Sequence, residues 1–169
     1  MPMKLFLSLL IAGCLLIQPT LAAAQVGLPR TSRLTIIDRD FMDSQRASID
    51  ELARTGLARQ IRGNKANDLD VLQQLLDRRL VAADEVLVLQ AMGIVLGDLL
   101  SEELKMPWVV YEDKLGRSRA LRLGLTKYYL FPVTMISRRA EVGAPVNVKA
   151  IYDKAVETMA PHLPPKPFQ

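Results

Sequence analysis

The stretch DEVLVLQAMGIVLGDLLSEEL, residues 84–104, decides the fold, because it is apolar on nearly every side when it is wound as a helix. A helix of that kind is normally buried in the core of a protein. Gln90 and Asp98 interrupt the apolar run, which argues against a membrane span. We therefore expect a buried helix from Asp84 to about Leu104.

Two amphipathic helices are expected before this central helix. The first is capped by Asp38 or Asp40 and ends near Ile61, because its apolar side chains recur at helical spacing with charges between them. The second is shorter, is capped by Asn67 or Asp68, and carries a stripe of leucines. The sequence therefore predicts three consecutive helices.

The spacing of the apolar residues changes after the third predicted helix. Residues 107–113 are rich in β-branched and aromatic side chains, and residues 113–116 fit a four-residue turn with Asp first and Gly last. Residues 118–124 form the expected return strand, and residues 128–138 form a third strand in which apolar residues alternate. The pattern predicts a three-stranded antiparallel meander.

A closing helix and the two ends of the chain complete the predicted architecture. Asn147 can cap a last helix, which Pro161 stops. The expected class is α+β, with three N-terminal helices, the three-stranded antiparallel meander and a C-terminal helix in a single domain, residues 38–160. Residues 25–37 are an extended lead-in, and residues 161–169 are a proline-rich tail.

Residues 1–24 have the composition of an export signal. Lys4 gives a positive start, an apolar run of about thirteen residues follows, and small residues offer a cleavage site before Gln25. The run is shorter than the roughly 20 residues needed for a membrane-spanning helix. We expect an exported protein, periplasmic or secreted, whose mature chain has no transmembrane span.

A second kind of processing stays open at Cys14. Residues 11–14 resemble the lipobox of bacterial lipoproteins, in which Cys14 would carry a lipid anchor to the envelope. The apolar run continues beyond Cys14, whereas lipoproteins usually turn polar there, so cleavage near Ala24 is favoured. Cys14 is also the single cysteine, so the body of the protein has no thiol for a disulfide, a zinc site or a nucleophile.

The composition excludes several other chemistries. His162 is the single histidine and lies in the tail, which removes a Ser-His-Asp triad and a multi-histidine metal site. No phosphate-binding loop motif occurs. The formal net charge of +4 comes with no block of basic residues, so nucleic-acid binding has no support. We therefore predict no metal and no cofactor.

Carboxylates are the remaining catalytic candidates. Asp98 and Glu102 lie four residues apart on the central helix and share a face, and Asp113 begins the hairpin turn. A pair of carboxylates can run glycoside hydrolysis, and an aspartate buried in an apolar helix would have a raised pKa. In the plainer interpretation, Asp98 lies on the solvent-exposed edge of the helix or forms a hydrogen bond with a backbone group.

Aromatic and basic residues of the meander are candidates for ligand binding. Trp108 and Tyr111 lie on opposite faces of their strand, so one belongs to the core and the other can line a groove. Arg138 and Arg139 follow the third strand and can converge with arginines of the second strand to bind an anionic ligand. Solvent-facing strand positions also favour charge, which is the alternative explanation.

Gly93 and Gly97 stand one turn apart on the central helix. Glycine costs roughly 1 kcal/mol relative to alanine inside a helix. We interpret the pair as a place where another element packs too closely for a side chain, with Trp108 the expected neighbour of Gly97.

Several short motifs occur in a fixed order along the chain: Leu89-Gln90-Ala91-Met92-Gly93, Leu96-Gly97-Asp98, Trp108-Val109-Val110, Asp113, Gly116-Arg117, Leu130-Phe131-Pro132, Ser137-Arg138-Arg139 and Glu141-Val142-Gly143. In this order they resemble a bacterial family, the domain of unknown function 3806, over most of residues 40–155. The resemblance implies a fold and agrees with export. It supplies no catalytic residues.

Two hypotheses about function remain. The leading one is a non-enzymatic binding or accessory protein of the bacterial cell envelope, whose ligand is a partner protein or an anionic envelope component. The alternative is a carboxylate-dependent hydrolase acting on an envelope polymer. Two carboxylates roughly 5–9.5 Å apart in one cleft would favour the hydrolase.

Overall fold

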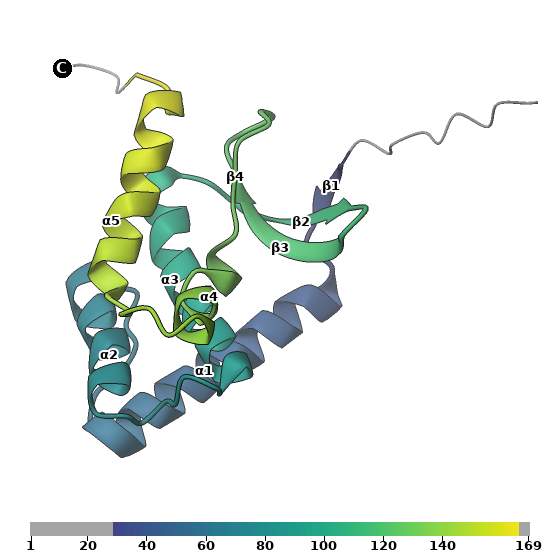
Figure 1. Cartoon of the computed structure of the whole chain (residues 1–169). Helices are drawn as coiled ribbons and strands as arrows, with labels where there is room; N and C mark the ends of the chain where they lie inside the picture. Colours follow the sequence, from purple (N-terminus) through teal and green to yellow (C-terminus); the bar gives the residue numbers. More distant parts are fainter. Residues whose placement is uncertain (1–28, 166–169) are drawn as a thin grey trace, which may run out of the picture.

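The computed structural model describes residues 29–165, so the predicted export signal and Cys14 lie outside the described part. Figure 1 shows the arrangement of the helices and strands. In chain order they are β1 (Arg30–Arg33), α1 (Ile36–Leu57), α2 (Lys65–Asp77), α3 (Val86–Leu104), β2 (Trp108–Asp113), β3 (Gly116–Arg122), β4 (Tyr129–Leu130), the 3-10 helix η1 (Pro132–Thr134), α4 (Ser137–Glu141), α5 (Val148–Met159) and the 3-10 helix η2 (Ala160–His162). The class is α+β, as the sequence predicts.

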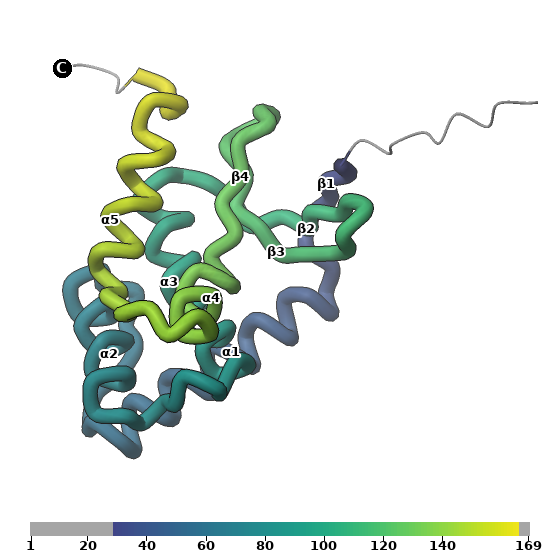
Figure 2. The backbone as a smooth tube through the Cα atoms, viewed as in Figure 1, coloured from purple at the N-terminus to yellow at the C-terminus, as the bar shows by residue number. Residues whose placement is uncertain are grey.

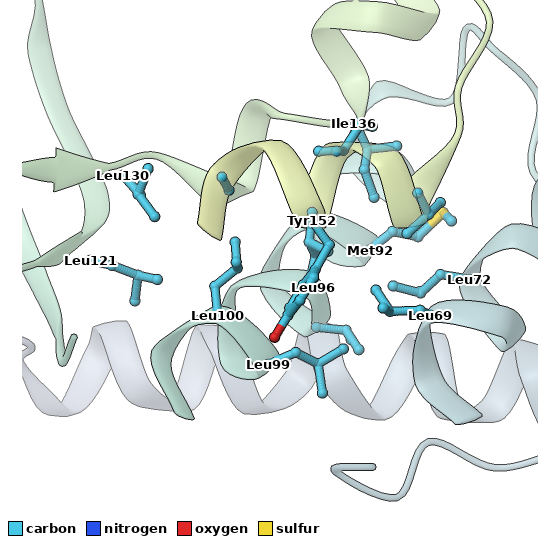
Figure 3. Close-up of a cluster of buried hydrophobic side chains, with 14 of the residues drawn as sticks. Leu69, Leu72, Met92, Leu96, Leu99, Leu100, Leu121, Leu130, Ile136 and Tyr152 are labelled. Carbon is cyan, nitrogen blue, oxygen red and sulfur yellow. The ribbon is translucent and has the colours of Figure 1, made fainter. Parts of the chain in front are cut away.

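Helix α3 lies at the centre of the molecule. Figures 1 and 2 show it between α1, α2 and α5, with the chain that follows β4 on another side. Its buried residues occupy every face, which confirms the interpretation of its all-round apolar pattern. Figure 3 shows that this core joins several elements: Leu69 and Leu72 of α2, Leu96 and Leu100 of α3, Leu121 and Leu130 of the sheet, Ile136, and Tyr152 of α5.

The sheet has four antiparallel strands in the order β1-β2-β3-β4. Strands β2 and β3 form the predicted hairpin, in which Asp113 pairs with Gly116. Strand β1 was not predicted, because Arg30–Arg33 lies in the segment expected to be an extended lead-in. It pairs with β2 from Arg30 opposite Glu112 to Arg33 opposite Val109. Four residues with mostly exposed side chains carry no hydrophobic alternation that could have revealed a strand.

The predicted third strand, residues 128–138, is wrong beyond Leu130. Only Tyr129–Leu130 pairs with β3, and the chain then turns into η1 and α4. Pro132 explains the break, because proline has no N–H to donate to a strand ladder. The backbone carbonyls of Pro132 and Val133 instead lie against Gly93 of α3. The alternation of apolar residues reflects packing of this irregular segment on α3.

The first helix begins and ends earlier than predicted, and the second begins earlier. Thr35 is the N-cap of α1, and its side chain and that of Asp38 form a reciprocal capping box. Ala58 then ends α1 in the left-handed conformation. Asn64, rather than Asn67 or Asp68, caps α2 by accepting a hydrogen bond from the backbone N–H of Asn67.

The C-terminal helix begins as predicted. Asn147 caps α5 by accepting a hydrogen bond from the backbone N–H of Ala150. The segment after α5 differs from the expected tail, because Pro161 lies inside η2 and the ring of His162 stacks on the ring of Tyr128, with 3.8 Å between the centroids. His162 therefore connects the segment after α5 to the loop between β3 and β4.

Candidate functional site

The Asp98 side chain of α3 forms hydrogen bonds with α1 and β2 and so joins three elements of the fold. Arg46 of α1 donates to it from Nε at 2.7 Å and from a terminal guanidinium nitrogen at 2.8 Å, and the indole Nε1 of Trp108 donates at 3.0 Å. The hydrogen bonds from Arg46 raise the pKa of that guanidinium above its ordinary value. The Asp98 side chain is 36% exposed, so it lies on the solvent-exposed edge of α3, as the plainer interpretation expects.

The other two catalytic candidates have separate partners. Glu102 is exposed and pairs with Lys105 at the end of α3. Asp113 accepts a hydrogen bond from the backbone N–H of Leu115 at 2.8 Å within the hairpin turn. Trp108, which contacts Asp98, and Asp113 occupy opposite ends of β2, about 16 Å apart at the usual strand rise. The fold therefore does not gather Asp98 and Asp113 around a common substrate position.

Trp108 and Tyr111 divide as expected between the two faces of the sheet. A Cβ atom on Gly97 would lie 2.3 Å from the Trp108 ring, so Trp108 packs directly against α3. Tyr111 lies on the outer face, where its ring makes edge contacts with Tyr129 at 5.0 Å and Phe131 at 5.2 Å between centroids. These three rings cover part of the sheet face that is opposite to α3.

Arg138 and Arg139 belong to α4, because the predicted third strand ends before them. Arg138 is exposed, and Arg139 donates from its guanidinium to the backbone carbonyl of Met135 at 2.8 Å. The arginines that do converge are Arg117 and Arg119 of β3, which both reach Asp38 on the first turn of α1. The sequence had indicated Asp38 only as a possible helix cap.

Asp38 is the centre of a buried charge cluster and is 1% exposed. Its Oδ2 atom accepts hydrogen bonds from Arg117 at 2.5 Å, from the Thr35 hydroxyl at 2.7 Å and from the Thr35 backbone N–H at 3.0 Å. Its Oδ1 atom lies 3.0 Å from a guanidinium nitrogen of Arg119. The hydrogen bond from Arg117, followed by those from Thr35, holds the pKa of Asp38 well below its usual range against the opposing effect of burial.

Beside this cluster lies a cavity of about 150 Å³, which we call the Arg119 pocket. Its lining comes from α1, α3, β3 and the residues of η1: Phe41, Gln45, Leu87, Gln90, Ala91, Ile94, Arg119 and Val133. The guanidinium of Arg119 stacks on the Phe41 ring at 4.2 Å. Its Nε atom is buried and has no hydrogen-bond partner among the described residues. Buried donors are normally paired, but this atom has almost no exposed surface, so a ligand in the pocket would meet other atoms of the Arg119 side chain.

The rim of the Arg119 pocket is apolar. Leu87 is 76% exposed and Phe41 is 43% exposed. Ile37, one turn before Phe41 on α1, is 78% exposed. Phe41 and Leu87 therefore stand partly in solvent at a pocket that Arg119 also lines, and Ile37 extends the apolar surface along α1. This combination of an apolar surface and a few polar groups is typical of ligand sites.

A larger groove of about 560 Å³ runs between α2 and α5. At one end Glu103 accepts hydrogen bonds from Lys65 at 2.8 Å and from the hydroxyl of Tyr152 at 3.1 Å. Burial, with the hydrogen bond to Glu103, raises the pKa of Tyr152. At the other end Lys149 pairs with Asp153. The lysines of this groove already have carboxylate partners.

Two further properties concern residues 29–165 alone. None of their helices combines the length and the apolar character needed to cross a bilayer. Their His, Asp and Glu side chains form no group of three or more that is placed to hold a metal ion.

Comparison with known proteins identifies the family. The model of the domain of unknown function DUF3806 matches residues 68–152, half of the chain, so the chain belongs to that family. The match begins at Asp68 within α2, covers α3 and the hairpin, and ends at Tyr152 in α5. The sequence motifs had indicated the same family.

One solved structure shares the fold. A crystal structure from Bacteroides thetaiotaomicron superposes with a TM-score of 0.72 over 80% of this chain, at 16% sequence identity. The chain spans about half of that protein, since the superposition covers 50% of it. No curated protein matches the chain.

Proposed function

We propose that this chain is a non-enzymatic binding protein of the bacterial cell envelope and that it holds an anionic group in the Arg119 pocket. The observation that carries the proposal is the Arg119 pocket itself, in which an arginine side chain lies among apolar walls. A guanidinium keeps its proton at every physiological pH, so this group can bind an anion and cannot act as a general base.

The carboxylates support binding over hydrolysis. Asp98 is held by Arg46 and Trp108, and Asp113 is used by the hairpin turn. A general acid or base has to exchange protons with a substrate, and groups held in this way serve first to join elements of the fold. We therefore favour binding over the hydrolase alternative.

The envelope location rests on the composition of residues 1–24. We expect the mature chain to begin near Gln25 and to carry no lipid. The intact mass of the natively processed protein distinguishes this from a chain that begins at a lipidated Cys14, and a diacyl or triacyl mass would place the protein on a membrane surface instead.

Paired probes test the binding function. Ligand-detected NMR compares acids and phosphate esters with their uncharged amides or alcohols, for the wild type and for Arg119→Met. We expect saturation transfer to several anions, little to their neutral partners, and a loss of the difference in the variant. The matched control is Arg122→Met, an arginine on the outer face of the same strand.

The same samples test the alternative. Cell-wall oligosaccharides incubated with the wild type should remain intact. Product release that Asp98→Asn abolishes would establish the hydrolase and would remove the binding proposal.

A further inference from the structure

The free edge of the sheet forms a surface that we call the β1 edge. It consists of β1, the first turn of α1 that follows it, and the β2–β3 turn, which lies beside the start of β1 because Arg30 pairs with Glu112 near the end of β2. Figures 1 and 2 show these three parts along one side of the molecule, away from α2 and α5. Among the described residues, β1 has no strand partner on its other side.

Large apolar side chains stand in solvent at both ends of β1. Leu115 of the β2–β3 turn is 87% exposed, and Ile36 and Ile37 of α1 are 69% and 78% exposed. The two ends of β1 are only about 10 Å apart at the usual strand rise, so these side chains border one short strand. Single apolar side chains are common on protein surfaces, but a group of them around one strand is a candidate interaction surface.

The charged side chains of the β1 edge are mainly basic. Asp38 and Glu112 offset the charges of Arg117 and Arg119. The charged side chains that remain are the basic Arg30, Arg33, Arg39 and Lys114 and the acidic Asp40 and Asp113. None of the four basic ones forms an ion pair with another residue of the described chain. An excess of positive charge therefore accompanies the exposed apolar side chains.

The upstream part of the chain joins the protein at this surface. The described chain begins at Pro29, directly before β1, and residues 1–24 have the composition of an export signal. Cleavage near Ala24 leaves a cationic α-amino group a few residues before Pro29, and processing at Cys14 would leave a lipid upstream of it. Both kinds of processing attach a group that favours membranes to the chain at the β1 edge.

We propose that the β1 edge binds an anionic membrane surface. Peripheral binding gains from the burial of apolar side chains among the lipid headgroups and from the attraction of basic side chains to anionic lipids. Leu115 and the two isoleucines supply the first contribution, and the arginines of β1 supply the second. Water and headgroups at this depth can pair with the backbone groups along the free side of β1. The inference does not depend on the ligand of the Arg119 pocket.

The composition of β1 disfavours two other occupants. Full antiparallel pairing of two β1 strands would place Arg30 of one copy opposite Arg33 of the other, and like charges in that position destabilise a ladder. An acidic segment of another protein would match the arginines, but a strand of four residues offers it few backbone hydrogen bonds. A membrane can contact the apolar side chains at both ends of β1 at the same time.

Co-sedimentation of the natively processed protein with vesicles tests the proposal. We expect binding to vesicles of phosphatidylglycerol and phosphatidylcholine in equal amounts, little binding to phosphatidylcholine alone, and weaker binding at high salt. No sedimentation with the anionic vesicles, or equal sedimentation with both kinds, would overturn the proposal. A chain whose mass shows a lipid at Cys14 is instead tested by the NMR measurement below.

Two pairs of variants assign the binding to the β1 edge. Arg30→Gln combined with Arg33→Gln should weaken vesicle binding about tenfold, whereas Arg78→Gln combined with Arg79→Gln, which removes the same charge beyond the end of α2, should change it less than about twofold. Leu115→Ser should weaken binding about threefold or more, and Leu125→Ser, on the β3–β4 loop, should leave it unchanged. Equal losses in the test and control variants would contradict the assignment.

NMR with a spin-labelled lipid locates the contact directly. Bicelles of the same lipids that contain a headgroup nitroxide should weaken the methyl signals of Ile36, Ile37 and Leu115 and spare that of Leu125. Equal weakening of all four signals would overturn the proposal. Polyglutamate is the probe for an acidic protein partner: polyglutamate binding that the Arg30 and Arg33 double variant abolishes, without any binding to anionic vesicles, would assign the β1 edge to an acidic polypeptide instead.

Discussion

Replacing Asp38 with asparagine is expected to lower the free energy of unfolding by about 3 kcal/mol, at the lower end of the 3–5 kcal/mol typical of a broken buried ion pair. The variant keeps an oxygen that can accept a hydrogen bond from the backbone N–H of Thr35, and it removes the charge that Arg117 and Arg119 share. Arg117 is 44% exposed and can regain water, which is why we expect the lower value. Urea denaturation followed by circular dichroism measures the loss.

The pH dependence of the stability of the wild type and of Asp38→Asn tests whether the ion pair causes this loss. The folded-state pKa of Asp38 is depressed, so its contribution to stability is fully present above the unfolded-state pKa of about 4 and is lost as the pH falls through the folded-state pKa. The gap in stability between the wild type and Asp38→Asn should therefore be constant from pH 7 to about 5 and narrow below about pH 4. A gap that stays constant to pH 2 would show that the ion pair contributes nothing.

Asp43→Asn is the matched control on the same helix. Asp43 pairs with Arg46 three residues later, and its side chain is 72% exposed. Solvent screens such a surface pair, so we expect a change of at most about 0.5 kcal/mol.

Replacing Gly93 with alanine is expected to destabilise the protein by about 1–3 kcal/mol, despite the higher helix propensity of alanine. An alanine Cβ atom would lie 2.5 Å from the carbonyl oxygen of Val133 and 2.6 Å from that of Pro132. Both neighbours are backbone atoms and cannot rotate away, so η1 would have to move off α3. The denaturation midpoint should fall, and η1 amides should lose protection in hydrogen exchange.

A glycine on α1 provides the control for this substitution. An alanine Cβ atom at Gly56 would meet mainly the flexible end of the Leu80 side chain, which can move. Gly56→Ala should therefore be neutral or stabilising by up to about 1 kcal/mol. A higher midpoint for Gly93→Ala would mean that the backbone of η1 does not rest on α3.

Local signals made much of this architecture predictable. The all-round apolar run of α3, the Asp113-Gly116 turn and the Asn147 cap each reflect neighbours within a few residues of sequence. Gly97 was also interpretable, because a glycine inside a buried helix implies close packing, and the Trp108 ring does occupy that space.

Features that depend on distant residues could not be predicted. Strand β1 exists because β2 offers a free edge, and its own side chains carry no strand pattern. The Arg119 pocket depends on α1, α3, β3 and η1 meeting in space. The sequence indicated a convergence of arginines from the second strand, but it could not indicate their partner, Asp38, which lies 79 residues from Arg117. Arg138 and Arg139 were misplaced for the same reason that the third strand was, namely the break at Pro132.

The Nε–H signal of Arg119 in a ¹⁵N-edited NMR titration tests the binding claim most directly. We expect this signal and the methyl signals of Ile94 and Val133 to shift together and saturate as an anion is added, while the Nε–H signal of Arg122 stays in place. Shifts that saturate at Tyr152 in the α2–α5 groove, or an Arg119 signal that never moves with any anion, would contradict the account.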